Sequence, residues 1–273
     1  MGPVLIIGSR KKPGVVEAVD KWTAHLEKEF GVVAVDLEGT RDLTDTKAEW
    51  AIVFGGDGAI LAASRRMGAK PVPTLAVNHG RLGFLTEVED HQLEDALARV
   101  ASGKFKLLDR MRLEMVLGKT SALALNDVVF TTASSGRLIH VVAKIERREA
   151  LRYAGDGVVL ATPAGSTAYS LAAGGPILDP ELEATVITPL AAHALSQRPL
   201  VVPSSRKIEL CLGEGESRGA VVVDGQDRWD VGPDDVVHVH KAERPFQLIR
   251  VGMRSYYSRL RRILGWGGRP RYS

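Results

Sequence analysis

The sequence is poor in several features that mark special classes of protein. Its 273 residues include a single cysteine, Cys211, so no disulfide can form within the chain and a reducing compartment is favoured. No apolar run approaches the roughly 18 residues that a membrane-spanning helix needs. The apolar run at Val4–Ile7 is also too short for the core of a signal peptide. We therefore expect a cytoplasmic protein without a membrane partner.

Net charge is also small. Lys and Arg total 36, Asp and Glu total 33, and the formal net charge is +3. With 45% hydrophobic residues, the composition excludes a disordered chain and is that of an ordinary globular protein. Six arginines and no acidic residue occur between Arg254 and Arg271, a segment that could contact nucleic acid or anionic lipid. A solvated or interdomain segment is the more common explanation, so we predict no nucleic-acid partner.

The first third of the chain alternates strand and helix patterns. Short apolar runs predict buried strands, and a run with apolar residues at helical spacing, such as Val15–Phe30, predicts a helix. Strands separated by helices of this length indicate a parallel sheet with helices on both faces. The expected strands are 3–8, 32–36, 50–54 and 72–78, and the expected helices are 15–30, 59–67 and 90–101.

After about residue 105 the pattern changes to alternation. From Met111 to Gly118, every second residue is a large apolar one, which is the period of a strand. We therefore predict an α/β domain over residues 1–105 and a mainly β domain over 106–250, with one helix near 166–173. The other expected strands are 122–131, 138–146, 157–162, 208–213, 236–242 and 246–251.

The most informative segment is Gly55-Gly56-Asp57-Gly58, which follows a strand and opens a helix. In an open α/β sheet, ligands bind at the carboxyl ends of the strands. Glycines let the backbone approach a ligand, and the free N–H groups of a helix N-terminus suit phosphate. A carboxylate there repels phosphate unless it binds a hydroxyl, a metal or a proton, so Asp57 is a candidate base. An ordinary Asp-Gly turn explains the four residues equally well.

Other nucleotide-binding signatures are absent. The sequence has no P-loop, no third glycine of the dinucleotide fingerprint and no Asp-Phe-Gly kinase motif. After the next expected strand, Asn78 could hydrogen-bond a ligand and Phe84 could stack on a base. Packing of the Phe84 ring against the sheet is at least as common an outcome.

Polar residues also interrupt the β-rich half. Asn126 and Asp127 lie within an otherwise apolar strand pattern, and neighbouring residues of a strand point to opposite faces. At least one side chain therefore needs a polar partner, which ribose hydroxyls or an adenine edge would supply; the alternative is a turn at a strand end. The glycine-rich stretch 153–176 contains a Gly-Ser-Thr loop at 165–167 and Tyr169, which can stack on a ring.

Evidence for a metal site is weak. His238 and His240 fall on one face of an expected strand, which zinc could use, but the sequence places no third ligand. A satisfied or exposed pair is favoured, and we predict no protein-bound metal. Cys211 stands between two leucines and fits a core position.

Together these motifs resemble those of bacterial-type NAD kinases over nearly the whole chain. Gly-Gly-Asp-Gly is shared with diacylglycerol and sphingosine kinases, whereas the Gly-Ser-Thr-Ala-Tyr block at 165–169 is far more specific. The matching segments are 55–58, 78–86, 126–127, 156–157, 162–169, 187–189, 198–199, 224–226 and 257–266.

The resemblance implies an α/β domain, a β-rich domain and a final segment, 251–273, that returns to the first domain. It implies phosphoryl transfer from ATP to the 2′-hydroxyl of the adenosine ribose of NAD, giving NADP, with Asp57 as general base. Mg²⁺ or another divalent cation would arrive with ATP, and the family forms homodimers and homotetramers. Motifs and resemblance together assign ligand binding to Gly55, Gly56, Gly58, Asn78, Phe84, Asn126, Asp127, Arg137, Asp156, Gly165, Ser166, Thr167, Ala168, Tyr169, Ser170 and Gln226.

Some positions depart from the family pattern. Ala62 and Ala154 stand where many members have basic residues, and Ala164 replaces a frequent Thr. Asp127 is one methylene shorter than the family's Glu. Phosphate binding would then rely on other groups.

Arg81 and Arg137 are candidates for that phosphate contact. Two other functions stay open. A lipid kinase would share the Gly-Gly-Asp-Gly loop but needs an apolar acceptor groove, and a dinucleotide-binding regulator would bind NAD without catalysis.

Overall fold

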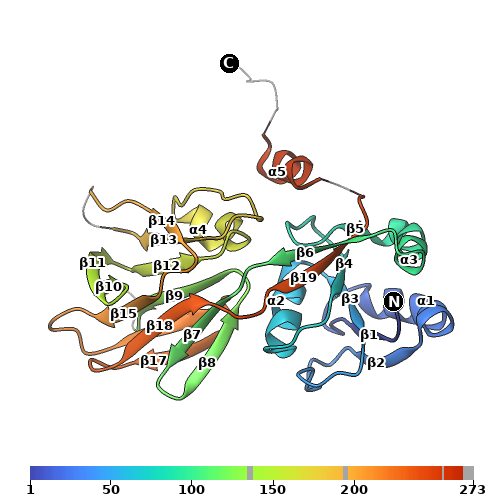
Figure 1. Cartoon of the computed structure of the whole chain (residues 1–273), viewed down its shortest axis with the longest axis horizontal. Helices are drawn as coiled ribbons and strands as arrows, with labels where there is room; N and C mark the ends of the chain where they lie inside the picture. Colours follow the sequence, from blue (N-terminus) through green and yellow to red (C-terminus); the bar gives the residue numbers. More distant parts are fainter. Residues whose placement is uncertain (134–137, 193–195, 254, 267–273) are drawn as a thin grey trace. The chain divides into compact units, whose positions relative to one another are not determined.

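The computed structural model describes residues 1–133, 138–192, 196–253 and 255–266. The chain divides into two compact units, with elements labelled in Figure 1. Unit 1 consists of residues 1–109 together with the chain from Phe246 onward, and unit 2 consists of residues 110–245. Unit 1 is therefore discontinuous in sequence. Within the described ranges, none of the helices combines the length and apolar character needed to cross a membrane.

Unit 1 is built on a seven-stranded sheet with the order β2-β1-β3-β4-β19-β6, in which β5 also pairs with β4. The pairings β1–β2, β1–β3, β3–β4, β4–β5 and β4–β19 are parallel. Every residue of β1, β3 and β4 is buried, as expected for strands covered on both faces. The strands are β1 (Val4–Ile7), β2 (Val32–Asp36), β3 (Trp50–Gly55), β4 (Thr74–Asn78), β5 (Val88–Glu89), β6 (Lys106–Arg110) and β19 (Phe246–Arg250).

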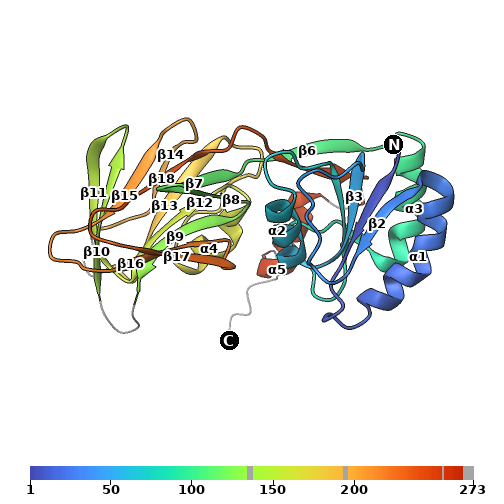
Figure 2. The ribbon, with the colours of Figure 1, turned by 90° about the horizontal axis from the view of Figure 1, so that it is seen from below.

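Helices cover both faces of this sheet, with α1 and α3 on one side and α2 on the other (Figure 2). In α1, residues such as Val15, Trp22 and Leu26 recur at helical spacing and pack against apolar residues of β1 and β3. The helices of unit 1 are α1 (Val15–Phe30), α2 (Asp57–Arg66), η1 (Asp90–Gln92), α3 (Leu93–Ala101) and α5 (Tyr256–Leu264).

Buried charged groups tie the end of the chain to unit 1. The Glu87 carboxylate accepts hydrogen bonds from the backbone N–H groups of residues 251–253, at 3.3, 3.0 and 3.0 Å, and pairs with Arg250 at 3.2 Å. Arg259 of α5 is 2% exposed and donates to the Thr86 carbonyl oxygen at 2.8 Å. Part of the arginine-rich tail is therefore an internal anchor of unit 1.

Unit 2 is a sandwich of two six-stranded sheets in which neighbouring strands are antiparallel. The inner faces share one core, which includes Met115, Phe130 and Val141. One sheet has the order β11 (Arg148–Gly155), β10 (Ile139–Ile145), β15 (Ile208–Leu212), β18 (Val236–Lys241), β7 (Leu113–Leu117) and β8 (Thr120–Ala124). The other has the order β14 (Leu200–Pro203), β13 (Ala184–Leu190), β12 (Gly157–Ala161), β9 (Asp127–Thr132), β16 (Gly219–Val223) and β17 (Asp227–Val231).

The predicted fold class is confirmed, with an α/β unit and a mainly β unit. The strand expected at 246–251 and grouped with the second domain instead joins the sheet of unit 1, where Leu248 of β19 lies opposite Thr74 of β4. Periodicity identifies a strand but not the sheet it joins. The single strand expected at 122–131 is two strands, β8 and β9, and the helix expected at 166–173 is the short pair η2 (Gly165–Thr167) and α4 (Tyr169–Ala172).

Candidate functional site

In unit 1, Asp57 is the first residue of α2, two residues after the last residue of β3, Gly55. Its half-buried carboxylate accepts two backbone hydrogen bonds, from the N–H of Phe84 at 2.7 Å and from the N–H of Leu85 at 3.0 Å. Each carboxylate oxygen has a further lone pair, so the group can still accept a proton or a ligand hydrogen bond. The candidate base is thus fixed at the carboxyl end of a central strand.

The loop that holds this carboxylate needs glycine at position 83. A Cβ at Gly83 would overlap the Asp57 carboxylate. Glycine therefore lets the loop backbone lie against the side chain, which brings the two following amides within hydrogen-bonding distance. The glycine at 83 thus positions the candidate base without carrying any chemistry itself.

Asn78 and Phe84 belong to the same loop region. Asn78 is 9% exposed; its amide donates to the Gly80 carbonyl oxygen at 3.1 Å, and its Oδ1 accepts from the Thr86 hydroxyl at 3.4 Å. These bonds shape the loop. The Phe84 ring is half-buried, and its stacking on a base stays a prediction.

A basic side chain from another loop lies beside the glycines. A Cβ at Gly56 would lie 3.3 Å from the Lys12 Nζ, and a Cβ at Gly80 would lie 3.9 Å from the same atom. Lys12 stands between β1 and α1, and no ion pair joins it to another described residue. Lys12 therefore adds a positive charge beside the glycine loop. Ala62, at a position of α2 where a basic residue was expected from the family pattern, adds none.

In unit 2, a buried carboxylate organises the segment that carries Asn126 and Asp127. Asp224 follows β16, and its carboxylate accepts hydrogen bonds from the backbone N–H groups of Leu125, Asn126 and Asp127, at 2.9, 2.7 and 3.1 Å. Because these amides bond to a side chain rather than to a neighbouring strand, β8 ends at Ala124 and the next strand begins only at Asp127. The Asn-Asp pair thus lies at a strand junction.

The two members of this pair differ in burial. Asn126 is half-buried, whereas Asp127 is 5% exposed. Neither side chain forms a hydrogen bond or ion pair with another described residue. Burial and, second, the negative charge of Asp224 raise the pKa of Asp127 to about 7. Both side chains are therefore available to a ligand.

The Thr162–Ser166 turn is bonded to the same segment. The Thr162 hydroxyl donates to the Leu125 carbonyl oxygen at 2.6 Å and accepts from the Gly165 N–H at 3.0 Å. The Thr162 N–H donates to the Asn126 carbonyl oxygen at 2.8 Å. A Cβ at Gly165 would overlap that same carbonyl oxygen, so only glycine allows this close approach. The two segments therefore form one bonded substructure.

Two of the predicted ligand-binding hydroxyls are fully buried and bonded within the protein. The Ser166 hydroxyl donates to the Pro163 carbonyl oxygen at 2.6 Å and accepts from the Leu178 N–H at 2.9 Å. The Ser170 hydroxyl lies 2.8 Å from the Thr188 hydroxyl. These bonds hold the glycine-serine-threonine loop on the sheet.

The other predicted ligand residues of unit 2 are more accessible. Asp156 and Gln226 are exposed, and the Tyr169 side chain is 49% exposed, which suits stacking on a ring. Thr167 and Ala168 are half-buried. In unit 1 Arg81 is exposed, and Arg137 lies outside the described residues.

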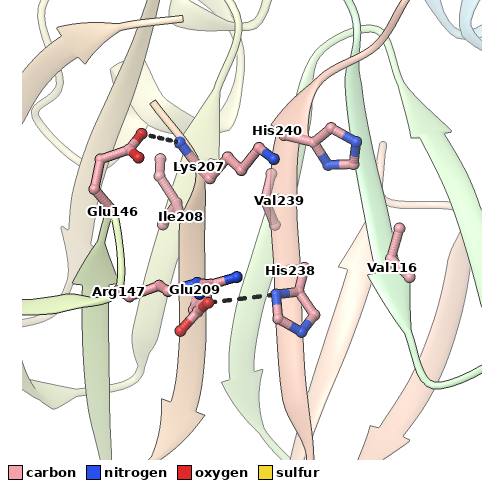
Figure 3. A pocket seen from close by; sticks show the side chains of 9 residues that line it. All are labelled: Val116, Glu146, Arg147, Lys207, Ile208, Glu209, His238, Val239 and His240. Atoms are coloured by element: carbon pink, nitrogen blue, oxygen red, sulfur yellow. Dashed lines mark hydrogen bonds and ion pairs between the residues drawn. The ribbon is translucent and has the colours of Figure 1, made fainter. Parts of the chain in front are cut away.

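A separate surface pocket of unit 2, with a volume of about 490 Å³, contains the two histidines (Figure 3). His238 and His240 lie on β18; His238 Nδ1 is 3.7 Å from Glu209 Oε1, and His240 Nε2 is 3.6 Å from Glu114 Oε2. No group of three or more His, Cys, Asp or Glu side chains in the described part of the chain could hold a metal ion. The residues lining the pocket are Val116, Glu146, Arg147, Lys207, Ile208, Glu209, His238, Val239 and His240.

Both units match known protein families. The family model for the ATP-NAD kinase N-terminal domain matches residues 12–105, and that for the C-terminal domain matches residues 125–251. The chain belongs to the ATP-NAD kinase family. NAD kinases of Rhodopirellula baltica and Heliobacterium modesticaldum are 34% identical over 271 residues and 42% identical over 221 residues. These alignments cover 97% and 79% of this chain, and 87% and 78% of those proteins.

Solved structures of NAD and NADH kinases share the fold. Yeast NADH kinase complexed with NADH has a TM-score of 0.86 at 26% identity, covering 100% of this chain and 90% of that chain. An NAD kinase from Archaeoglobus fulgidus in complex with ATP has a TM-score of 0.80 at 26% identity, covering 96% and 97%. This chain is therefore an enzyme of the NAD kinase family in sequence and in fold.

The sequence did not predict the positioning roles of three residues at these sites of the NAD kinase fold. Gly83 and Lys12 contact the Gly-Gly-Asp-Gly region from other loops, so no local pattern links them to it. Asp224 lies in the Asp-Gly-Gln motif at 224–226, which signals a ligand contact but not a carboxylate that bonds 98 residues back along the chain.

Proposed function

We propose that this enzyme phosphorylates the 2′-hydroxyl of the adenosine ribose of NAD with ATP, giving NADP, and that Asp57 is the general base. The observation that carries the proposal is the fixed Asp57 carboxylate, bonded to two backbone amides at 2.7 and 3.0 Å beside a glycine loop. Membership of the NAD kinase family supplies the substrate class.

In the proposed step, the ribose oxygen attacks the terminal phosphorus of ATP and the bond from that phosphorus to the bridging oxygen breaks. The hydroxyl proton passes to Asp57, and ADP leaves. A positioned general base contributes about 10²–10⁴-fold to such a rate. The two amides that hold Asp57 keep its free lone pairs in one place, which is what a base in a transition state needs.

The triphosphate would be bound by main-chain N–H groups at the start of α2 and by the Lys12 ammonium group. These N–H groups carry partial positive charge, and Gly55, Gly56 and Gly58 leave room for phosphate oxygens. Lys12 lies beside the same loop and adds a full charge. Because no described cluster of residues forms a metal cage, Mg²⁺ would come with ATP and neutralise part of the phosphate charge.

The dinucleotide would be bound by polar groups of unit 2. Asn126 and Asp127 provide side chains that form no hydrogen bond or ion pair with another described residue, and Tyr169 provides an exposed ring. Asp156 and Gln226 add exposed polar groups. This set suits a polar acceptor with hydroxyls and a base, rather than a lipid.

The test is to incubate the protein with NAD, ATP and Mg²⁺ and to detect NADP with an NADP-specific dehydrogenase. We expect NADP that depends on all three reagents. Binding of NAD without NADP formation would indicate a regulator, and phosphorylation of diacylglycerol or a sphingoid base in its place would indicate a lipid kinase. Either result overturns the proposal.

A further inference from the structure

The carboxyl group of Asp127 is the most unusual polar group of unit 2. It is 5% exposed, yet no hydrogen bond or ion pair joins it to another described residue. Burying a charge without a partner is costly, and such a group either neutralises or receives its partner from a ligand. Asp127 and Val129 are two residues apart in β9, so their side chains lie on the same face of the sheet. This face also carries Ala161 and Leu178.

The nearest charged group cannot move away from it. The Asp224 carboxylate is held by three backbone N–H groups, one of which belongs to Asp127 itself. A carboxylate with three such bonds is strongly favoured in its charged form. Asp224 also has φ +50°, a backbone conformation that L side chains rarely adopt and that surrounding contacts must maintain. A fixed negative charge therefore stands next to a buried second carboxyl group.

We propose that Asp224 is a positioning residue that fixes Asn126 and Asp127 and, together with the burial of Asp127, keeps Asp127 a neutral carboxylic acid, which donates its O–H to an acceptor oxygen or ring nitrogen of the bound dinucleotide. In this arrangement Asp127 keeps its proton first because it is buried and second because the neighbouring Asp224 carboxylate is negatively charged. Asp127 then provides a hydrogen-bond donor at neutral pH, at a position where the sequence alone suggests a carboxylate that can only accept. The raised pKa of Asp127, about 7, agrees with this geometry.

Among the described residues, the elements around Asp127 bring few titratable groups to its side. The strands paired with β9 are β12 and β16, and neither has a titratable side chain. The 162–168 turn contributes only hydroxyls, and α4 contributes Tyr169, which is exposed. On β17, the half-buried Asp227 lies in register with Val223, next to Asp224, whereas Arg228 is directed to the far end of β9, where it donates to the carbonyl oxygens of Thr132 and Ala133.

Strands of the other sheet, β7 and β10, pack against the opposite face of β9. Their titratable side chains are paired on the outside of that sheet or at its end. Glu114 lies 3.6 Å from His240, and His140 lies 2.8 Å from Glu216. Lys144 of β10 lies in register with Glu209 of the neighbouring strand. Asp224 is thus the charged group that adds to the effect of burial on Asp127.

The inference rests on the proposed function only in taking NAD as the ligand. It is tested by calorimetric titration of the full chain with NAD, without ATP, between about pH 6.0 and 8.5. If only the neutral acid binds, the dissociation constant of the wild-type protein rises roughly 30-fold over this range. Asp127→Asn, whose amide is a donor at every pH, should bind NAD with less than about threefold change across it.

Asp224→Asn removes the fixed charge, so the midpoint of the pH dependence should move to lower pH. A residue with a merely structural role would weaken binding without moving that midpoint. Asp234→Asn, an exposed carboxyl group in the turn before β18, is the matched control and should keep the wild-type profile. If Asp224→Asn fails to fold, the comparison of wild type with Asp127→Asn decides the question alone.

A flat wild-type profile would overturn the inference, as would an Asp127→Asn profile that matches the wild type. An unmoved midpoint in folded Asp224→Asn would overturn the role of Asp224. These outcomes are separate from the proposed function, because NADP formation is measured in a different assay. An enzyme that forms NADP but binds NAD equally at every pH would keep the function and lose this inference.

Discussion

Each unit of this kinase contains a buried carboxylate that accepts hydrogen bonds from three consecutive backbone amides. In unit 1, Glu87 holds residues 251–253, and in unit 2, Asp224 holds residues 125–127. The two sites differ in their ionisable neighbour, which is the basic Arg250 for Glu87 and the acidic Asp127 for Asp224. The same kind of anchored carboxylate thus has an oppositely charged partner in one unit and a second acid beside it in the other.

This difference separates structure from function. The buried Glu87 and the half-buried Arg250 form an ion pair that helps to hold residues 250–253 in unit 1, and nothing in the proposed reaction uses it. Beside Asp224, burial and the nearby negative charge raise the pKa of Asp127, an acid whose side chain no described residue hydrogen-bonds. Both units therefore use a carboxylate that accepts hydrogen bonds from backbone amides. Its ionisable neighbour determines whether the arrangement stabilises the fold or forms part of a ligand site.

The largest expected effect concerns a third anchored carboxylate, Asp57, which accepts only two amide hydrogen bonds. If it is the base, Asp57→Asn should lower turnover about 10²–10⁴-fold while NAD binding is retained, because the amide cannot take the hydroxyl proton. Initial rates of NADP formation and calorimetry measure the two quantities. Asp20→Asn on the exposed face of α1 is the control. A near wild-type rate for Asp57→Asn would show that Asp57 is not the general base.

Second, Glu87→Gln should lower the free energy of unfolding by about 3 kcal/mol, because it breaks a buried ion pair and leaves the Arg250 charge uncompensated by Glu87. Denaturant unfolding of the Glu87→Gln protein measures this, with the exposed Glu29→Gln of α1 as control. A change no larger than that of the control would show that the unit 1 anchor is not the stabilising one.

Third, the unit 2 anchor should make stability depend on pH in the opposite direction from an ordinary paired acid. The pKa of Asp127 is raised from 3.8 to about 7 on folding. Below the lower value both states hold the proton; between the two values only the folded state does, so the contribution to stability falls as pH rises and is lost above about 7.

Asp127→Asn removes this titration, so the unliganded variant should exceed wild type in stability by roughly 2 kcal/mol at about pH 8.5 and by much less near pH 5. Urea unfolding at the two pH values measures the difference. An equal difference at both values would contradict the assignment of a buried proton to Asp127.

The smallest expected effect tests whether the two units bind different ligands. Lys12→Ala should raise the KM for ATP about tenfold, since one charge-assisted hydrogen bond to phosphate contributes about 1.5 kcal/mol or more, and should leave the KM for NAD nearly unchanged. Steady-state rates with each substrate varied in turn measure this. Lys11→Ala, at the neighbouring exposed position, is the control. Equal effects from both variants would remove Lys12 from the phosphate site.

The sequence predicts what local patterns determine. Helical spacing identifies α1, apolar runs identify β3 and β4, and the Gly-Gly-Asp-Gly motif places Asp57 where the structure has it, at the start of α2. The ligand-binding roles of Asp57, Asn126, Asp127 and Tyr169 stay predictions.

What the sequence does not predict depends on contacts between distant segments. The break between β8 and β9 arises from Asp224, about a hundred residues further along the chain, and the pattern at 122–131 shows only continuous apolar residues around the pair. Membership of β19 in the first sheet and the position of Lys12 beside Gly56 are likewise products of topology. Local propensity has no information about any of them.

The place of β19 in the sheet has a consequence for how the chain is made. It lies between β4 and β6, and it leaves the ribosome only after the whole of unit 2 has been made. Until then β4 and β6 cannot share a finished sheet, whereas unit 2 is a continuous segment that emerges whole beforehand. During synthesis unit 2 should therefore acquire its structure before the sheet of unit 1 is complete.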